Sequence, residues 1–358
     1  MRVPFLFSIP VVLFLSAPAL AADKGKAFNP DISANFLGLI QHGSNYSSDR
    51  SQKPREGAQL QEAELQFTSD VDAYLRAVAL FSVKQEAGKS EFSVDPEEVY
   101  VETISLPVVT IRGGKFKMAL GRHNQLHSHA FPFIDAPVIH QRLLGDEGLN
   151  ENGVSVAALL PAPWFSELTL QAHTLGNETQ YKSRNSGDWG GVAHFKNLWD
   201  LSDSLTMELG LSGGAGNNQF GKKASILGSD LTFKWRPTEG GKYRSLAWSS
   251  EYLLAQRPGL EDASLESQQT LGGLASWLQY QFAERWWVQG RYEYVGLPKS
   301  KILSVVTKQS ALLGFFPSEF SGFRVQYDWI QDRARPKKDY AIAFQYNVSI
   351  GAHPAHAY

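Results

Sequence analysis

The chain has 358 residues, 34 Lys and Arg against 36 Asp and Glu, no cysteine, and a mean hydropathy of -0.26. A net charge of -2 offers no concentrated basic face for nucleic acid, so we expect no such partner. Without cysteine there are no disulfides, thiol nucleophiles or thiolate zinc sites. The mean hydropathy is also too polar for a bundle of transmembrane helices.

Residues 1–21 have the layout of a cleaved export signal. A basic start at Arg2 precedes an apolar run from Val3 to Leu15, and Ala19-Leu20-Ala21 matches the A-x-A cleavage pattern. The apolar run is too short to span a bilayer. We therefore expect residues 22–358 to form a single exported domain.

From Asp31 onward, apolar and polar residues alternate with a period of two, which is typical of strands with two different faces. In residues 323–329, for example, Phe, Val, Tyr and Trp alternate with Arg, Gln and Asp. The pattern predicts about sixteen strands, at 31–41, 58–69, 72–85, 91–105, 108–120, 152–160, 165–175, 189–198, 203–212, 223–236, 242–255, 268–283, 285–296, 307–316, 320–331 and 339–351.

Short and long connections alternate between these strands. A bacterial outer-membrane barrel has this asymmetry, with tight periplasmic turns, longer external loops and an even number of strands. Many of the segments reach ten residues, as a tilted membrane-spanning strand requires, whereas strands of a soluble β-sandwich average about 5–6 residues. Trp164, Trp235, Trp286 and Trp329 lie near segment ends, where a barrel carries its aromatic girdles. We therefore predict an all-β fold: a closed, transmembrane, antiparallel barrel in the outer membrane of a Gram-negative cell.

The third external loop, residues 121–151, is the longest connection, with the sequence GRHNQLHSHAFPFIDAPVIHQRLLGDEGLNE. Loops longer than about 15 residues without their own structure are uncommon unless functional. Its apolar residues, from Phe131 to Ile139, suit a position folded into the lumen against the inner wall. A constriction of the pore would then expose its polar side chains to the channel: Arg122, His123, His127, His129, Asp135, His140 and Arg142.

Four of the nine histidines fall in this loop: His123, His127, His129 and His140. Imidazole is a good zinc ligand, and Asp135 or Asp146 could complete a site. The alternative is that the histidines make hydrogen bonds in the loop or tune the pore with pH. His353 and His356 belong to a tail that we expect on the opposite rim.

Charged residues of both signs fall on the polar faces of the early strands: Glu62, Glu64, Arg76, Glu98, Glu102 and Arg112. Opposed acidic and basic walls would create a transverse field that orients solutes, but the same residues could simply pair with one another. Gly113 and Gly114 suggest a bulge or a close approach of the loop backbone.

The stretch EEVYVETISLPVVTIRGGKFKMALGRHNQLHSHAFPFIDAP resembles a segment of phosphate-selective-type porins, in which a strand precedes the pore loop. Segments GRHNQLHSHAFPFID and QRLLGDEGLN also resemble uncharacterised porin-like proteins that are labelled zinc-regulated TonB-dependent outer-membrane receptors. The resemblance implies an outer-membrane channel. Removing 21 of 358 residues leaves 337, too few for the plug and twenty-two strands of a TonB-dependent receptor.

The predicted function is a porin-like channel for passive diffusion of small hydrophilic solutes or ions, without enzymatic activity and without a required cofactor. Its partners would be outer-membrane lipid, the barrel-assembly machinery and the solutes, and both a homotrimer and a monomer fit the sequence. One alternative is a zinc-linked uptake channel that uses the histidines of the third loop. Another class of alternative is a barrel enzyme, for which His123, Asn124 and Ser128 are the nearest group, or an adhesin.

Overall fold

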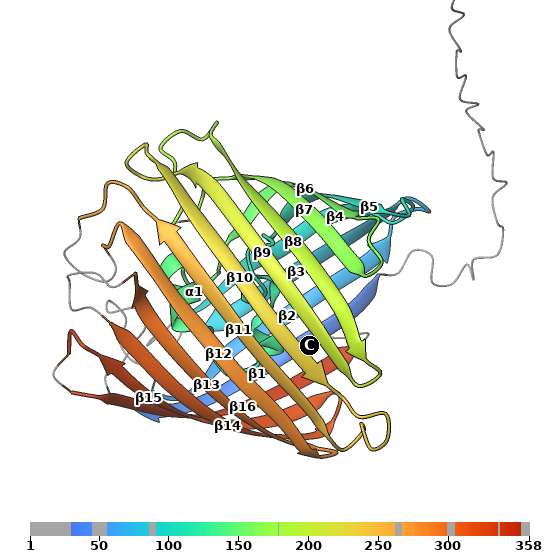
Figure 1. Cartoon of the computed structure of the whole chain (residues 1–358), viewed down its shortest axis with the longest axis vertical. Coiled ribbons are helices and arrows are strands. Elements are labelled where there is room, and N and C mark those ends of the chain that lie inside the picture. The colour runs from blue at the N-terminus through green and yellow to red at the C-terminus, as the bar shows by residue number, and fades with distance from the viewer. Residues whose placement is uncertain are drawn as a thin grey trace, which may run out of the picture.

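A computed structural model describes residues 30–44, 56–85, 91–177, 179–261, 267–298, 305–335 and 337–351. Its strands form one closed antiparallel barrel, in which each strand pairs with its neighbours in the sequence (Figure 1). The first strand closes the barrel on the last, with Ser33 opposite Gly351 and Gly43 opposite Ala341. The predicted fold class and strand number are confirmed. The predicted signal peptide, residues 1–21, and the tail after Gly351 lie outside the described residues.

The sixteen strands match the predicted ranges to within a few residues. They are β1 (Asp31–Gly43), β2 (Gly57–Asp70), β3 (Leu75–Gln85), β4 (Phe92–Thr103), β5 (Val109–Lys117), β6 (Asn150–Leu159), β7 (Phe165–Thr174), β8 (Trp189–Ser202), β9 (Leu205–Asn217), β10 (Lys223–Trp235), β11 (Ser245–Gln256), β12 (Thr270–Ala283), β13 (Trp286–Leu297), β14 (Val306–Ser318), β15 (Ser321–Asp332) and β16 (Asp339–Gly351). Short helices occur between β5 and β6: η1 (His123–Gln125), η2 (Ser128–Ala130) and α1 (Val138–Leu144).

The two faces of each strand have the chemistry that the alternation predicts. On β15, Val325 and Tyr327 are exposed on the outside of the barrel, whereas Arg324, Gln326 and Asp328 are buried inside it. Aromatic residues are exposed near both ends of the strands, for example Trp164 and Trp286 beside short connections and Trp329 near an external loop. This arrangement suits a barrel with a lipid-facing apolar band between two interfacial girdles.

The alternation of connection lengths fails at one place. The external connection between β9 and β10 has only five residues, 218–222, while the inner connection between β10 and β11 has nine, 236–244. The strand β9 continues to Asn217 because its glycine-rich end, residues 213–216, still pairs with β8 and β10 through the backbone. Glycines carry no side chain that could display the alternation, so the sequence pattern ends the strand too early.

The pair Gly113-Gly114 marks a close approach between strands. Gly114 has a φ of +139°, and a side chain at this position would collide with the backbone of Val99 and Tyr100 on β4. The approaching backbone therefore belongs to β4 rather than to the third loop.

The apolar core lies inside the barrel, around the third loop. The helix α1 packs against β11, β12 and β13, and lies within the barrel in Figure 1. Its residues Val138, Ile139, Leu143 and Leu144 join a cluster of inward-facing side chains that includes Val192, Ile226, Leu253, Leu271, Val295 and Ile330. A smaller cluster packs Phe133 and Ile134 against Leu39, Leu312 and Ala343. The loop is thus held to the inner wall by apolar packing, as predicted. Among the described segments, no helix is long and apolar enough to cross a membrane.

Candidate functional site

The third external loop, residues 118–149, forms a narrow neck where it leaves the wall. Asn124 Nδ2 donates to the carbonyl oxygens of Met118 (2.7 Å) and Leu149 (3.1 Å), and Leu149 N donates to Asn124 Oδ1 (2.7 Å). A single buried amide therefore satisfies three backbone groups. Nearby, Gly121 has a φ of +67°, and a side chain there would collide with the Glu251 carboxylate. Only glycine allows the chain to turn so tightly against β11.

Asp135 anchors the far side of the loop to β13, β14 and β15. It accepts hydrogen bonds from Arg291 Nη2 (2.8 Å), from Lys308 Nζ and from Gln326 Nε2 (2.6 Å), while Arg291 Nη1 donates to its backbone oxygen (3.0 Å). Burial by itself would raise the pKa of Asp135, but the charges of Arg291 and Lys308 outweigh it and hold that pKa well below its usual range. Asp135 therefore stays ionised and fixes the loop to this wall.

The first residues of the loop are bound to β9. Arg122 Nη1 donates to Glu208 Oε1 (2.7 Å), and Gly121 N donates to Ser212 Oγ (2.8 Å). Together with the contacts of Asp135, these hydrogen bonds hold the loop against the wall from β9 to β15.

Glu251 on β11 holds two of the loop histidines. It accepts a hydrogen bond from His123 N (3.1 Å), and its other oxygen lies 3.2 Å from His140 Nε2. The imidazole rings of His123 and His140 lie 4.8 Å apart. Burial, together with the charges of His140 and Arg291, lowers the pKa of His123 well below its usual value, so this ring is neutral at pH 7.

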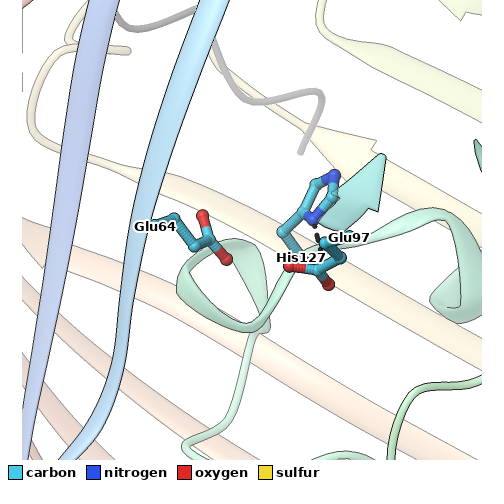
Figure 2. A group of neighbouring side chains, drawn as sticks. All are labelled: Glu64, Glu97 and His127. Carbon is cyan, nitrogen blue, oxygen red and sulfur yellow. Dashed lines mark ion pairs between the residues drawn. The ribbon is translucent and has the colours of Figure 1, made fainter. Parts of the chain in front are cut away.

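The other two histidines face β2 and β4. His127 Nε2 lies 3.1 Å from Glu98 Oε2, His127 Nδ1 lies 3.3 Å from Glu97 Oε1, and His129 Nδ1 contacts Glu64 Oε2. Figure 2 shows the Glu64 carboxylate on one side and the pair of Glu97 and His127 on the other. Burial opposes the charged form of His127, but its hydrogen bonds to Glu97 and Glu98 outweigh this effect and raise its pKa to about 10.

The polar residues predicted to line the constriction are in the barrel, but most do not face open solvent. His129, His140 and Arg142 are buried, and the side chains of Arg122, His127 and Asp135 are mostly covered by their partners on the wall. Their expected exposure to the channel is therefore wrong for most of this set. The physical reason is that a charge in a narrow lumen is stabilised by an opposite charge within contact distance.

The four histidines do not gather into one site. His123 and His140 meet at Glu251 on β11, whereas His127 and His129 meet carboxylates from β2 and β4. A zinc site built from all four histidines thus finds no support in this geometry. Asp135, one of the carboxylates expected to complete it, is engaged by Arg291 and Lys308 instead.

The charged residues predicted on the lumen face pair locally. Arg112 Nη2 lies 2.8 Å from Glu102 Oε2, and its guanidinium lies over the ring of Tyr100, 4.1 Å from the centroid. Arg76 pairs with Asp70 at the short-turn end of β3, and Glu62 pairs with Lys84 (3.2 Å). Of the two interpretations offered by the sequence, mutual pairing describes these contacts.

The sequence pattern missed Glu97, which a β-bulge turns inward. The register of β3 and β4 shifts between Leu80 and Phe81, so Leu80 faces Glu98 and Phe81 faces Pro96. Glu97 is the extra residue, and both Glu97 and Glu98 reach His127. A bulge places two successive residues against one, which a period of two cannot represent. Other wall partners of the loop, such as Arg291, lie on the predicted polar faces, but nothing in the sequence pairs them with the loop.

A basic recess lies at the short-turn end of the barrel. Lys234, Arg236 and Lys242 line it together with Asp203, and its volume is about 750 Å³. The recess lies between the connections that follow β8 and β10, at the mouth opposite the external loops.

Comparison with known proteins shows which folds this barrel resembles. No family model matches the chain. An uncharacterized protein of Aquifex aeolicus (strain VF5) is 27% identical over 404 residues, which cover 96% of this chain and 83% of the relative.

Solved structures with a similar fold are porins and channels of the outer membrane. The anion-selective porin from Comamonas acidovorans has a TM-score of 0.60 at 11% identity, covering 90% of this chain and 99% of the porin. The outer membrane channel DcaP of Acinetobacter baumannii has a TM-score of 0.58 at 10% identity, covering 90% and 97%. OmpT of Vibrio cholerae in its trimer form has a TM-score of 0.54 at 9% identity, covering 90% and 99%.

The closed sixteen-stranded barrel and its inserted third loop therefore define a porin-like outer-membrane β-barrel. The predicted porin-like fold is confirmed, and the solved structures that share it are porins and channels of the outer membrane.

Proposed function

We propose that this protein is a channel for the passive diffusion of small hydrophilic solutes or ions, narrowed by the third loop. The observation that carries the proposal is the loop itself, which is bound on opposite sides of the lumen through Glu98 on β4 and Arg291 on β13. Residues Arg122, His123, His127, His129, Asp135, His140 and Arg142 are the proposed constriction, most of them acting by fixing the position of the loop. Export through a signal peptide cleaved after Ala21 is part of the same proposal.

The chemistry of the inner wall favours hydrophilic solutes. Charged and amide side chains line the lumen on β2, β4, β9 and β13 to β16, and the mouth opposite the loops carries a basic recess. Both signs of charge occur, as expected for a path that admits polar solutes in general.

The test is conductance of the purified mature protein in planar bilayers, together with swelling of proteoliposomes in sugars of increasing size. We expect discrete conductance steps and a cut-off in solute size. A barrel that inserts correctly but neither conducts nor admits sugars would contradict the channel and favour an adhesin or enzyme.

The side chains considered for catalysis are engaged elsewhere. Asn124 closes the neck of the loop, His123 lies against Phe131 with ring centroids 4.3 Å apart, and Ser128 hydrogen-bonds to Glu62. A nucleophile needs its base within hydrogen-bond reach, and each of these three side chains contacts a different partner instead. A porin-like channel fold is also generally non-enzymatic, so we propose no catalytic role.

We further propose that the protein assembles as a homotrimer, because OmpT of Vibrio cholerae, which has a similar fold, occurs in a trimer form. The mass of the protein in detergent, measured by light scattering or native mass spectrometry, tests this. A single-chain mass in mild detergent and after cross-linking in membranes would contradict it.

A second candidate function is metal-linked uptake, and the gathering of His127 with Glu64 and Glu97 favours it. Proteoliposomes that enclose a zinc-sensitive dye would report entry of Zn²⁺. Entry no faster than that of Mg²⁺ would exclude a zinc preference.

A further inference from the structure

A group of metal-ligating side chains joins the third loop to two strands of the wall. Glu64 on β2, Glu97 on β4 and His127 in the loop each offer one ligand atom, and these atoms lie within 4.8 Å of one another (Figure 2). The three residues come from elements far apart in the sequence, so the group exists only when the loop is folded into the barrel.

Two carboxylate oxygens in this group lack a partner. Glu64 Oε1 and Glu97 Oε2 are buried and accept no hydrogen bond from the residues that the structure describes. Glu64 is 4% exposed and Glu97 2% exposed. A buried charged oxygen without a partner is costly, so these atoms favour the binding of a cation within the group.

The charge around the group is also unbalanced. Five carboxylates, those of Glu62, Glu64, Glu97, Glu98 and Glu147, face two ammonium groups, those of Lys84 and Lys117. Three negative charges remain when both neighbouring histidines are neutral, and two remain when His127 is an imidazolium. Two of these protein charges belong to the proposed ligands Glu64 and Glu97, so a divalent cation placed there would compensate most of the excess.

Two further contacts orient the ligands. His127 Nε2 is held by Glu98 at 3.1 Å, which leaves Nδ1 directed towards Glu97. His129 contacts Glu64 Oε2, which leaves Oε1 of the same carboxylate available. A carboxylate behind a ligating imidazole is the usual outer shell of a protein metal site, because it fixes the tautomer and the ring orientation.

We propose that Glu64, Glu97 and His127 bind one divalent transition-metal ion of the Zn²⁺ class, which ties the third loop to β2 and β4. Two carboxylates and one imidazole suit such an ion, whereas Mg²⁺ and Ca²⁺ prefer sites made of oxygen ligands alone. Three protein ligands leave a coordination position for water or a solute. The competing explanation is an ion-pair network that protons alone neutralise, with His127 as an imidazolium between Glu97 and Glu98.

The experiment titrates Zn²⁺, with Mg²⁺ as the control ion, into the purified full chain in detergent after treatment with a chelator. All measurements use a His353→Ala, His356→Ala background, so that the tail histidines do not contribute. Calorimetry reports the stoichiometry and affinity, and the d–d absorption of bound Co²⁺ reports the coordination. X-ray absorption of the Zn²⁺-loaded protein, which needs no further substitution, reports how many imidazoles are bound.

We expect one Zn²⁺ per chain, one imidazole among its ligands, and an affinity at least about tenfold weaker in Glu64→Gln and in His127→Gln, since even outer-shell changes weaken metal sites by this factor. The matched control is His140→Gln, which alters another buried histidine paired with a glutamate and should leave the affinity unchanged. Variants that lose their heat-modifiable barrel mobility on gels are replaced by Glu97→Gln.

Absence of saturable Zn²⁺ binding, equal affinity in the ligand variants, or a zinc shell without imidazole would each overturn the site and leave the proton-neutralised network. These readouts are independent of conductance, so a protein that conducts but binds no zinc refutes only this inference.

Discussion

Replacing Asp135 with asparagine tests whether ion pairs hold the constriction loop in the lumen. Arg291 and Lys308 have side chains only 2% and 5% exposed, and both would face a neutral amide in place of a carboxylate. A hydrogen bond to a charged group contributes about 1.5–3 kcal/mol. Arg291 keeps Glu293 at 2.9 Å and Lys308 keeps Asp328 at 3.3 Å. We therefore expect Asp135→Asn to reduce the free energy that holds the loop in place by about 2–3 kcal/mol. This is less than the sum of two charged hydrogen bonds, because both cations keep a second carboxylate.

This loss acts on local opening of the loop, because the barrel strands keep their own hydrogen bonds. Because about 1.4 kcal/mol corresponds to a tenfold change in an equilibrium constant, the population of molecules with a detached loop rises roughly 30- to 140-fold. Hydrogen exchange followed by mass spectrometry should show faster exchange in residues 131–145, where Ile134 N and Val138 N are bonded to the wall. Channel recordings should show more frequent current fluctuations.

The control is Asp146→Asn, which changes an exposed carboxylate in the same loop. If Asp135→Asn exchanges as slowly as Asp146→Asn and as the unchanged protein, ion pairs do not hold the loop and apolar packing of α1 alone suffices.

Four further outcomes follow from the same contacts. Because the pKa of Asp135 is lowered by folding, its stabilisation is complete above the unfolded value of about 3.9 and is lost progressively as pH falls below that value towards the folded pKa; the protection of the loop amides, corrected for the slower intrinsic exchange in acid, should therefore fall between about pH 5 and pH 3 in the unchanged protein, and constant protection would contradict this. Asn124→Ala leaves Leu149 N without its acceptor, while the carbonyl oxygens of Met118 and Leu149 keep the amides of Leu120 and Met118, so it should cost about 1–3 kcal/mol in urea unfolding from micelles; an unchanged stability would mean that water replaces the amide. Gly121→Ala forces a positive φ on a residue with a side chain and displaces a wall carboxylate, so it should cost about 1–2 kcal/mol in the same assay, and wild-type stability would refute the strain. Arg112→Ala removes the cation paired with Glu102 and should raise the cation-to-anion permeability ratio roughly two- to fivefold, measured from reversal potentials; an unchanged ratio would place this pair away from the ion path.

The strands of the barrel wall could be predicted from the sequence because the alternation that marks each strand lies within the strand itself. A strand with lipid on one side and the lumen on the other must alternate with a period of two, and this alternation is visible in residues 323–329 without any knowledge of the partner strand. The prediction from this alternation was wrong in two places. The glycine-rich residues 213–216 have no side chains that could show the alternation, and at the bulge of Glu97 the backbone departs from a period of two.

The insertion of the third loop into the barrel could be predicted from the sequence, but its contacts with the wall could not. Its length, its apolar run and its four histidines indicate a segment folded into the barrel, and the packing of Phe133 and Ile134 agrees with this. The division of the histidines between Glu251 and the carboxylates of β2 and β4 has no counterpart in their spacing.

The sequence by itself therefore determined the class of fold, the number of strands, the face of most residues and the identity of the inserted loop. Only the tertiary structure decided which wall residue meets which loop residue. Asp135 and Gln326 are 191 residues apart, and they meet because the barrel closes on itself and brings β15 opposite the loop. Closure is a property of all sixteen strands together, so no local pattern encodes that contact, and the same holds for the group of Glu64, Glu97 and His127.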